Sequence, residues 1–125
     1  MTREGFTLAQ AFACATNGIR IASRERNFRI ELCFLLLCVV LGFVFAISPV
    51  EWALCFVCFG LVLGGEALNT AIEAVVDLVS PGYHELAGIA KDCAAGATYL
   101  FALSALAVGI IIFAPKILLM IGISL

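Results

Sequence analysis

The stretch LCFLLLCVVLGFVFAISPV, residues 32–50, contains no charged side chain. One helix needs roughly 20 apolar residues to cross the hydrocarbon core of a bilayer, so this stretch is long enough by itself. Two further uncharged stretches follow, at residues 52–65 and 93–115. The third stretch is also long enough, whereas the second can cross only if its helix continues beyond Glu66. The sequence therefore predicts three membrane-spanning helices.

The composition of the chain also indicates a membrane protein. Of its 125 residues, 64% are hydrophobic and 13% are charged, and the mean hydropathy is +1.17. A typical soluble domain is about 45–50% apolar and about 25% charged, and a small soluble protein has a large surface to cover with polar groups. The composition excludes a soluble enzyme, a disordered tail and a nucleic-acid-binding protein. We expect a single membrane domain over residues 1–125.

These patterns predict an all-α membrane protein with spans at about 30–48, 51–79 and 87–114. A further amphipathic helix is expected at about 5–23, on the membrane surface, because apolar side chains recur there on one helical face. The apolar positions of this segment are Leu8, Phe12, Ala15, Ile19 and Ala22. An ordinary cytoplasmic leader is the alternative interpretation of the same residues.

The positive charges predict the orientation of the chain. Five arginines precede the first span and Lys91 lies between the second and third, whereas only Lys116 lies on the other side. By the positive-inside rule we expect a cytoplasmic N-terminus. Scattered charges before residue 32 do not fit a cleavable signal peptide, so the first span is expected to remain as an anchor. The third span is expected to end near Pro115, and residues 117–125 to lie along the outer interface.

The six cysteines do not indicate a metal site. Cys55 and Cys58 form a C-x-x-C pair, but no second pair or histidine lies nearby, as a zinc site would require. We expect the thiols to act as small apolar side chains within the spans.

A stripe of polar side chains lies on the second predicted span. Glu66, Asn69, Glu73 and Asp77 recur at positions i, i+3, i+7 and i+11, which places them within an arc of about 80° on a helix. An ionised side chain at membrane depth costs on the order of 2.5–3.5 kcal/mol, so such residues usually have a function. A salt-bridge network or a solvated helix end is the alternative interpretation, above all for Asp77.

The spacing within this stripe predicts two different roles. Glu66 and Glu73 lie about 10.5 Å apart along the helix axis, too far for one divalent cation with ligand distances of about 2.0–2.5 Å to bridge them. We expect the deeper Glu66 to meet a group in the lipid and the shallower Glu73 to meet a polar ligand from the cytoplasm. Asn69 lies between them and can orient either group.

Other polar residues are expected at the same depth, at the cytoplasmic ends of the spans. Together with the stripe they could hold a hydrated, multiply charged ligand such as a nucleotide with Mg²⁺. The chain contains neither a P-loop nor a glycine-rich kinase loop, so side chains and a metal would have to hold the phosphates. The contributing segments are residues 24–29, 83–85 and 91–92.

The segment EALNTAIEAVVD at residues 66–77, followed by YHEL at 83–86 and AKD at 90–92, resembles the bacterial integral-membrane diacylglycerol kinase family. The resemblance extends from about Glu25 to Lys116. It implies a homotrimer in the bacterial inner membrane, in which each chain has three spans and a surface helix. It also implies transfer of the γ-phosphate of ATP to the hydroxyl of a membrane lipid alcohol, with Mg²⁺ as cofactor.

The resemblance implies roles for individual residues as well. Glu66 would be the general base that faces the lipid hydroxyl, and Glu25 and Glu73 would coordinate the metal. Arg29, a weaker match, would lie near the region where the lipid substrate binds. The expected contacts with the nucleotide or the catalytic site are Asn69, Tyr83, His84, Lys91 and Asp92.

Two questions stay open on the sequence. Residues 48–52 and 92–97 are similar to the Gram-positive branch of the family, which includes undecaprenol kinases, whereas residues 73–77 and 83–86 are similar to the Gram-negative diacylglycerol kinases. The lipid is therefore either diacylglycerol, giving phosphatidic acid, or undecaprenol, giving undecaprenyl phosphate. The alternative function is a small proton or cation carrier that uses the acidic stripe, although the outer halves of the spans carry no charge.

Overall fold

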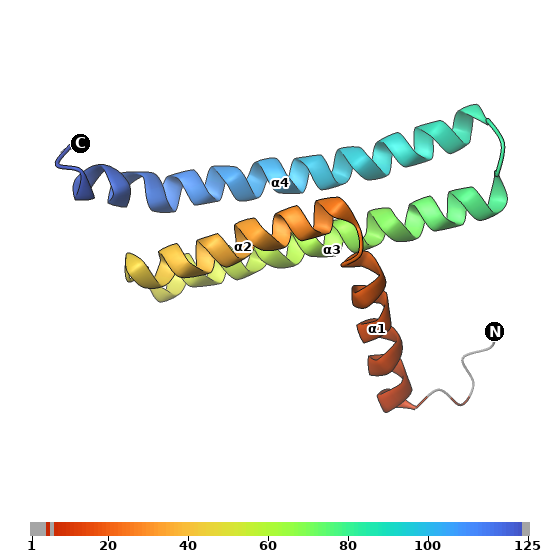
Figure 1. Cartoon of the computed structure of the whole chain (residues 1–125), viewed down its shortest axis with the longest axis horizontal. Coiled ribbons are helices and arrows are strands. Elements are labelled where there is room, and N and C mark those ends of the chain that lie inside the picture. Colours follow the sequence, from red (N-terminus) through yellow and green to blue (C-terminus); the bar gives the residue numbers. More distant parts are fainter. Residues whose placement is uncertain (1–4, 6, 124–125) are drawn as a thin grey trace.

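The computed structural model describes residues 5 and 7–123, which form four helices (Figure 1). These are α1 (Leu8–Ala22), α2 (Arg26–Val44), α3 (Pro49–Val79) and α4 (Glu85–Met120). The part of the chain described contains no β-strand. α2, α3 and α4 are each long and apolar enough to cross a membrane. The prediction of an all-α protein with three candidate spans is confirmed.

The helix of the first predicted span ends at Val44, before the predicted bound of about residue 48. Ala46 adopts a left-handed conformation with φ of 46°, and the N–H of Ile47 donates to the carbonyl oxygen of Gly42 at 3.1 Å. A left-handed residue of this kind ends a helix because the backbone can no longer continue the regular hydrogen bonds. α2 therefore ends at Val44 instead of extending to about residue 48.

The turn after α2 leads into a strong helix start. The hydroxyl of Ser48 accepts the Glu51 N–H at 3.2 Å, and the Glu51 carboxylate accepts the Ser48 N–H at 2.7 Å. This reciprocal capping, with Pro49 at the first helical position, favours a helix from that residue on. Glu51 also accepts a hydrogen bond from the Lys116 ammonium at 2.5 Å, which joins the start of α3 to the far end of α4.

Removing one partner of this ion pair should lower the stability of the bundle. Both side chains are about three-quarters buried, and a charge left there without its partner is poorly solvated. We expect Lys116→Met to lower the midpoint of thermal unfolding in detergent, followed by far-UV circular dichroism. The double variant Glu51→Gln/Lys116→Met should recover part of the loss. Equal midpoints for the wild type and Lys116→Met would contradict a stabilising role.

The third span was predicted to end near Pro115, but the helix does not end there, because α4 continues through this residue to Met120. Proline lacks an N–H, so at position 115 it removes the hydrogen bond to the carbonyl of Ile111 but leaves the rest of the helix intact. Membrane helices tolerate such a proline where neighbouring groups satisfy the backbone. Residues 117–120 are thus the last turn of α4.

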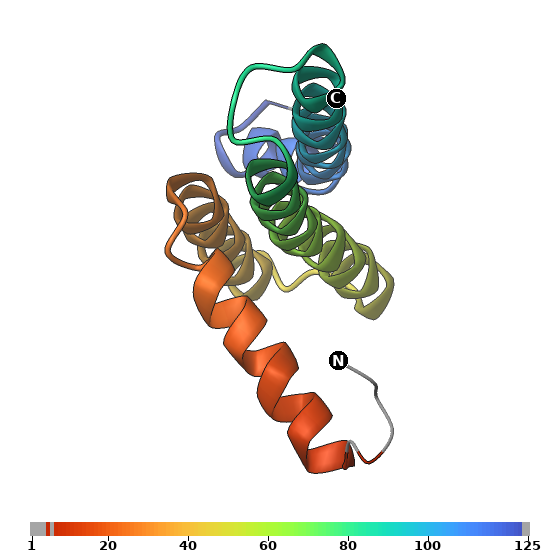
Figure 2. The same ribbon diagram turned by 90° about the vertical axis from the view of Figure 1, so that its right-hand side faces the viewer.

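α3 is the central helix of the molecule (Figures 1 and 2). α4 packs along it, α2 lies beside it, and α1 runs crosswise from the start of α2 and also contacts it. The apolar core is small and consists of Ile47, Cys55, Ile112 and Phe113. Most large apolar side chains face outward, which suits a protein whose surroundings are lipid tails.

The bounds of α1 lie inside the predicted range of 5–23. Its large apolar side chains, among them Leu8 and Phe12, are exposed, whereas Ala22 at its end is buried. A crosswise helix with an exposed apolar face has the geometry that binding along a membrane surface requires.

Candidate active site

A polar cavity of about 260 Å³ lies where the start of α2 meets the C-terminal half of α3. Two groups of residues line it, one around the N-terminus of α2 and the other along the polar stripe of α3. The lining residues are Glu25, Arg26, Asn27, Glu66, Asn69, Thr70 and Glu73. Four predicted site residues, which include Glu25 from a distant part of the sequence, therefore face one cavity.

Among the residues that the structure describes, Glu66 is the charged residue that is buried, and 4% of its surface is exposed. Neither of the two ion pairs found among the described residues includes it. A buried carboxylate without a cationic partner is costly to maintain, so it marks a functional site more often than a structural one. This geometry does not support a salt-bridge network as the explanation for Glu66.

Asn69 and Glu73 are joined across one turn of α3. The Asn69 Nδ2 donates to Glu73 Oε1 at 3.3 Å, which orients the amide. The Asn69 Oδ1 is buried and has no hydrogen-bond partner within the described residues. Because buried amide oxygens normally have a partner, this oxygen is placed to accept one from a ligand.

The cavity offers the donor atoms that Mg²⁺ prefers. The Glu73 carboxylate comes from α3 and the Glu25 carboxylate from the residue that precedes α2, and Asn69 lies between Glu66 and Glu73 along the stripe. Magnesium binds oxygen ligands, commonly one or two carboxylates with waters and substrate phosphates. No group of three or more His, Cys, Asp or Glu side chains gathers around one point among residues 5 and 7–123. Two carboxylates and an amide oxygen that line one cavity fit a metal whose remaining ligands are phosphate oxygens and water.

Lys91 lies at the edge of this site. Its ammonium forms an ion pair with Asp77 at 2.6 Å, and it is close enough to Glu73 to interact electrostatically. The pair ties α4 to the last turns of α3. For Asp77, the structural interpretation of the acidic stripe is thereby favoured.

Four other predicted contact residues do not line the cavity. His84 caps α4, where its Nδ1 accepts the Leu86 N–H at 3.2 Å. The Arg29 guanidinium donates to the backbone carbonyl of Arg24 at 3.1 Å. Tyr83, at 98% exposure, and Asp92 both face outward.

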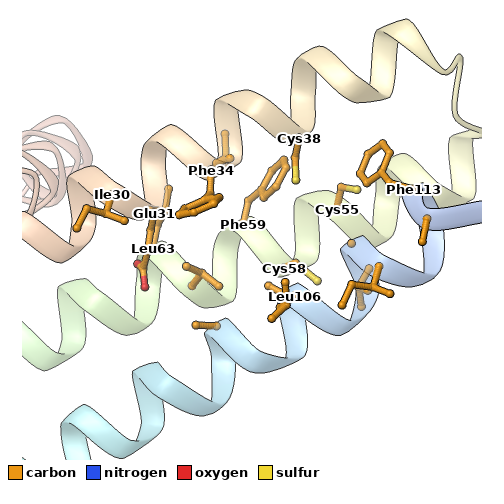
Figure 3. Close-up of a pocket in the computed structure, with 18 of the residues that line it drawn as sticks. Ile30, Glu31, Phe34, Cys38, Cys55, Cys58, Phe59, Leu63, Leu106 and Phe113 are labelled. Carbon is orange, nitrogen blue, oxygen red and sulfur yellow. The ribbon is translucent and has the colours of Figure 1, made fainter. Parts of the chain in front are cut away.

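Glu31 is a candidate site residue that the sequence reasoning missed. α2 directs its carboxylate toward α3 (Figure 3), its Oε2 is buried, and no hydrogen-bond partner for that oxygen lies within residues 5 and 7–123. It is close enough to Glu66 for the two carboxylates to repel each other. The available signal was its position as the last charge before the apolar stretch 32–50.

Glu31 also lies at one end of an apolar groove between α2, α3 and α4, with a volume of about 550 Å³ (Figure 3). Apart from this carboxylate, apolar side chains and three thiols line it. The thiols belong to Cys38, Cys55 and Cys58, none of which forms a disulfide. The expectation that these cysteines act as apolar side chains agrees with this position. The groove and the polar cavity lie next to each other where Glu31 approaches Glu66.

Comparison with known proteins adds independent information. A family model described as prokaryotic diacylglycerol kinase matches residues 13–113, which include every candidate site residue. The undecaprenol kinase of Bacillus subtilis (strain 168) is 41% identical over 112 residues, covering 86% of this chain and 89% of that protein. The diacylglycerol kinase of Synechocystis sp. is 40% identical over 113 residues, covering 89% of this chain and 65% of that protein. The diacylglycerol kinase of Escherichia coli (strain K12) is 38% identical over 98 residues, covering 77% of this chain and 80% of that protein.

Proposed function

Because the chain belongs to the prokaryotic diacylglycerol kinase family of membrane-bound lipid kinases, we propose that it transfers the γ-phosphate of ATP to a membrane lipid alcohol. The single observation that carries this proposal is the buried Glu66, which lines the polar cavity and lies beside the apolar groove. Family membership favours a kinase over the proton or cation carrier that the acidic stripe alone allowed. The reaction would take place at the cytoplasmic membrane interface.

The polar cavity is the proposed site of the nucleotide. Glu25 and Glu73 would coordinate Mg²⁺, and the free oxygen of Asn69 would accept a hydrogen bond from the ligand or its water. Bound there, the metal would supply positive charge to neutralise phosphate oxygens. Lys91 would add a second positive charge at the edge of the site, next to Glu73.

Glu66 is the proposed general base. Phosphoryl transfer requires mainly correct positioning and stabilisation of charge, together with a group that accepts the proton of the attacking hydroxyl. The carboxylate of Glu66 is held within the protein, so it can meet a hydroxyl that stays in the membrane. Glu73 lies two turns closer to the cytoplasmic end of α3, which agrees with different roles for the two carboxylates.

The apolar groove is the proposed binding site for the lipid chain. Its lining suits a hydrocarbon, and its polar end at Glu31 lies next to Glu66, where the hydroxyl must arrive. The lipid would enter from the side, through the membrane, while ATP enters from water. This arrangement requires a cytoplasmic N-terminus and α1 along the inner surface of the bacterial inner membrane, and we propose a homotrimer as the assembly.

The proposal can be tested with purified protein in mixed micelles and radiolabelled ATP. We expect label in the extracted lipid with diacylglycerol or with undecaprenol, and the faster of the two identifies the substrate. Transfer should stop when a chelator removes Mg²⁺ and resume when the metal is restored. No labelled product with either lipid would contradict the proposed function.

A further inference from the structure

Gly65, the residue before Glu66, is in unusually close contact with α4. A Cβ atom at this position would lie 2.6 Å from Cδ2 and 3.1 Å from Cε2 of Phe101. Optimal carbon–carbon separations are about 3.5–4.0 Å. The ring of Phe101 therefore lies in the space that the side chain of any other residue at position 65 would need.

This contact is particular to one face of α3. Gly65 is buried, and Glu66 beside it is also buried. The preceding Gly64 is exposed, and a Cβ atom there would meet no heavy atom within 4 Å. Both glycines lie in the middle of a regular helix, so backbone conformation does not explain the need for a glycine at position 65. The close approach of Phe101 does.

Movement at Gly65 must also move Glu66, because adjacent helical residues share a rigid backbone. Side chains that pack closely transmit such shifts, since there is little free volume to absorb them. Catalytic groups are sensitive to displacement, and a misplacement of about 1 Å can cost about 100-fold in rate. The contact between Gly65 and Phe101 thus acts on the residue proposed to accept the proton.

We propose that Phe101 is a positioning residue for phosphoryl transfer. Its ring, packed on Gly65, sets the distance between α3 and α4 at the level of Glu66 and so holds the Glu66 carboxylate beside the lipid groove. This inference rests on the proposed function of Glu66. Phe101 acts through the backbone of α3 and does not itself contact the reacting groups.

Two alanine variants separate this role from a general effect on the helix. Gly65→Ala and Gly64→Ala gain the same helix propensity, but only the first places a methyl group against Phe101. With lipid and Mg-ATP in mixed micelles, we expect Gly65→Ala to lower kcat about 10- to 100-fold. The KM for Mg-ATP should change less than about twofold, because Glu25 and Glu73 lie beyond the contact. Gly64→Ala should leave both constants within about twofold of the wild type.

A second substitution tests whether Phe101 is the cause. Leucine at position 101 is smaller than phenylalanine and makes room for the new methyl group, so Gly65→Ala/Phe101→Leu should recover at least about threefold in kcat over Gly65→Ala. Gly65→Ala as active as Gly64→Ala, or no recovery in a folded double variant, would overturn the inference. If Gly65→Ala does not fold, Phe101→Leu alone decides, and an unchanged kcat in that variant counts against the role.

The failure of the proposed function has a different signature. The wild type and Gly64→Ala would then both lack lipid phosphorylation, and the positioning role would fail with it. If both are active and only the Gly65 and Phe101 variants behave contrary to expectation, the kinase assignment stands and the positioning role alone is wrong.

Discussion

Glu66→Gln should abolish lipid phosphorylation while Mg-ATP still binds. The substitution keeps the shape of the side chain but removes its capacity to accept a proton, and general-base catalysis contributes about 10²- to 10⁴-fold. We expect kcat to fall by about that factor or more. Radiolabelled transfer in mixed micelles measures the rate, and equilibrium dialysis of Mg-ATP measures the binding. Binding should stay within about threefold of the wild type, because Glu66 is not a proposed metal ligand.

A matched substitution in the first turn of the same helix serves as the control. Glu51→Gln makes the same chemical change on α3, but Glu51 pairs with Lys116 far from the cavity. Assayed below its unfolding temperature, this variant should retain a kcat close to that of the wild type. If Glu66→Gln instead loses nucleotide binding, Glu66 belongs to the nucleotide site and the proposed separation of roles is wrong.

Glu73→Gln should weaken Mg²⁺ binding and leave the proposed general base intact. An amide oxygen is a weaker ligand for Mg²⁺ than a carboxylate, so we expect the Mg²⁺ concentration for half-maximal activity to rise about 10- to 100-fold. Part of the activity should return at high Mg²⁺, which no concentration of metal can achieve for Glu66→Gln. A titration of Mg²⁺ at fixed ATP and lipid separates the two variants.

Glu25→Gln provides the second test of the metal site. Glu25 reaches the cavity from the start of α2, so it should share the Mg²⁺ dependence of Glu73→Gln if both carboxylates hold one ion. An unchanged Mg²⁺ requirement in Glu25→Gln would show that this carboxylate has another role, and the metal would then depend on α3 alone.

The sequence predicted the spans and the stripe because both rest on local periodicity. Uncharged stretches near 20 residues long indicate membrane helices, and a polar repeat at i, i+3, i+7 and i+11 indicates one helical face. The predicted positions of the helix ends were less accurate, for a different reason in each helix. α2 ends at Val44, just before the left-handed Ala46, and alanine is a residue type that gives no warning of such a conformation. Pro115 looked like a helix end but lies within α4.

The candidate site was harder to predict than the spans, because it depends on how the helices pack against one another. The sequence placed residues 24–29 near the site, but Glu25 was singled out as a metal ligand only through the family resemblance, because no pattern in its own segment shows that it faces α3. Glu31 was missed for the same reason. His84 illustrates the opposite limit, since a histidine that caps a helix and one that binds a nucleotide look alike in sequence. The contact of Phe101 with Gly65 joins residues 36 positions apart, a pairing that only the packed structure reveals.

The central position of α3 has a consequence for how this chain tolerates random mutation. One helix carries Glu66, Asn69 and Glu73, and it is also the helix on which α1, α2 and α4 all pack. In a library of single substitutions, selection for growth that requires the cell to make the phosphorylated lipid should therefore remove variants along α3 first. Both the packed face and the polar face of this helix should be affected. α1, which contacts the bundle mainly at one end, should accumulate neutral changes most freely.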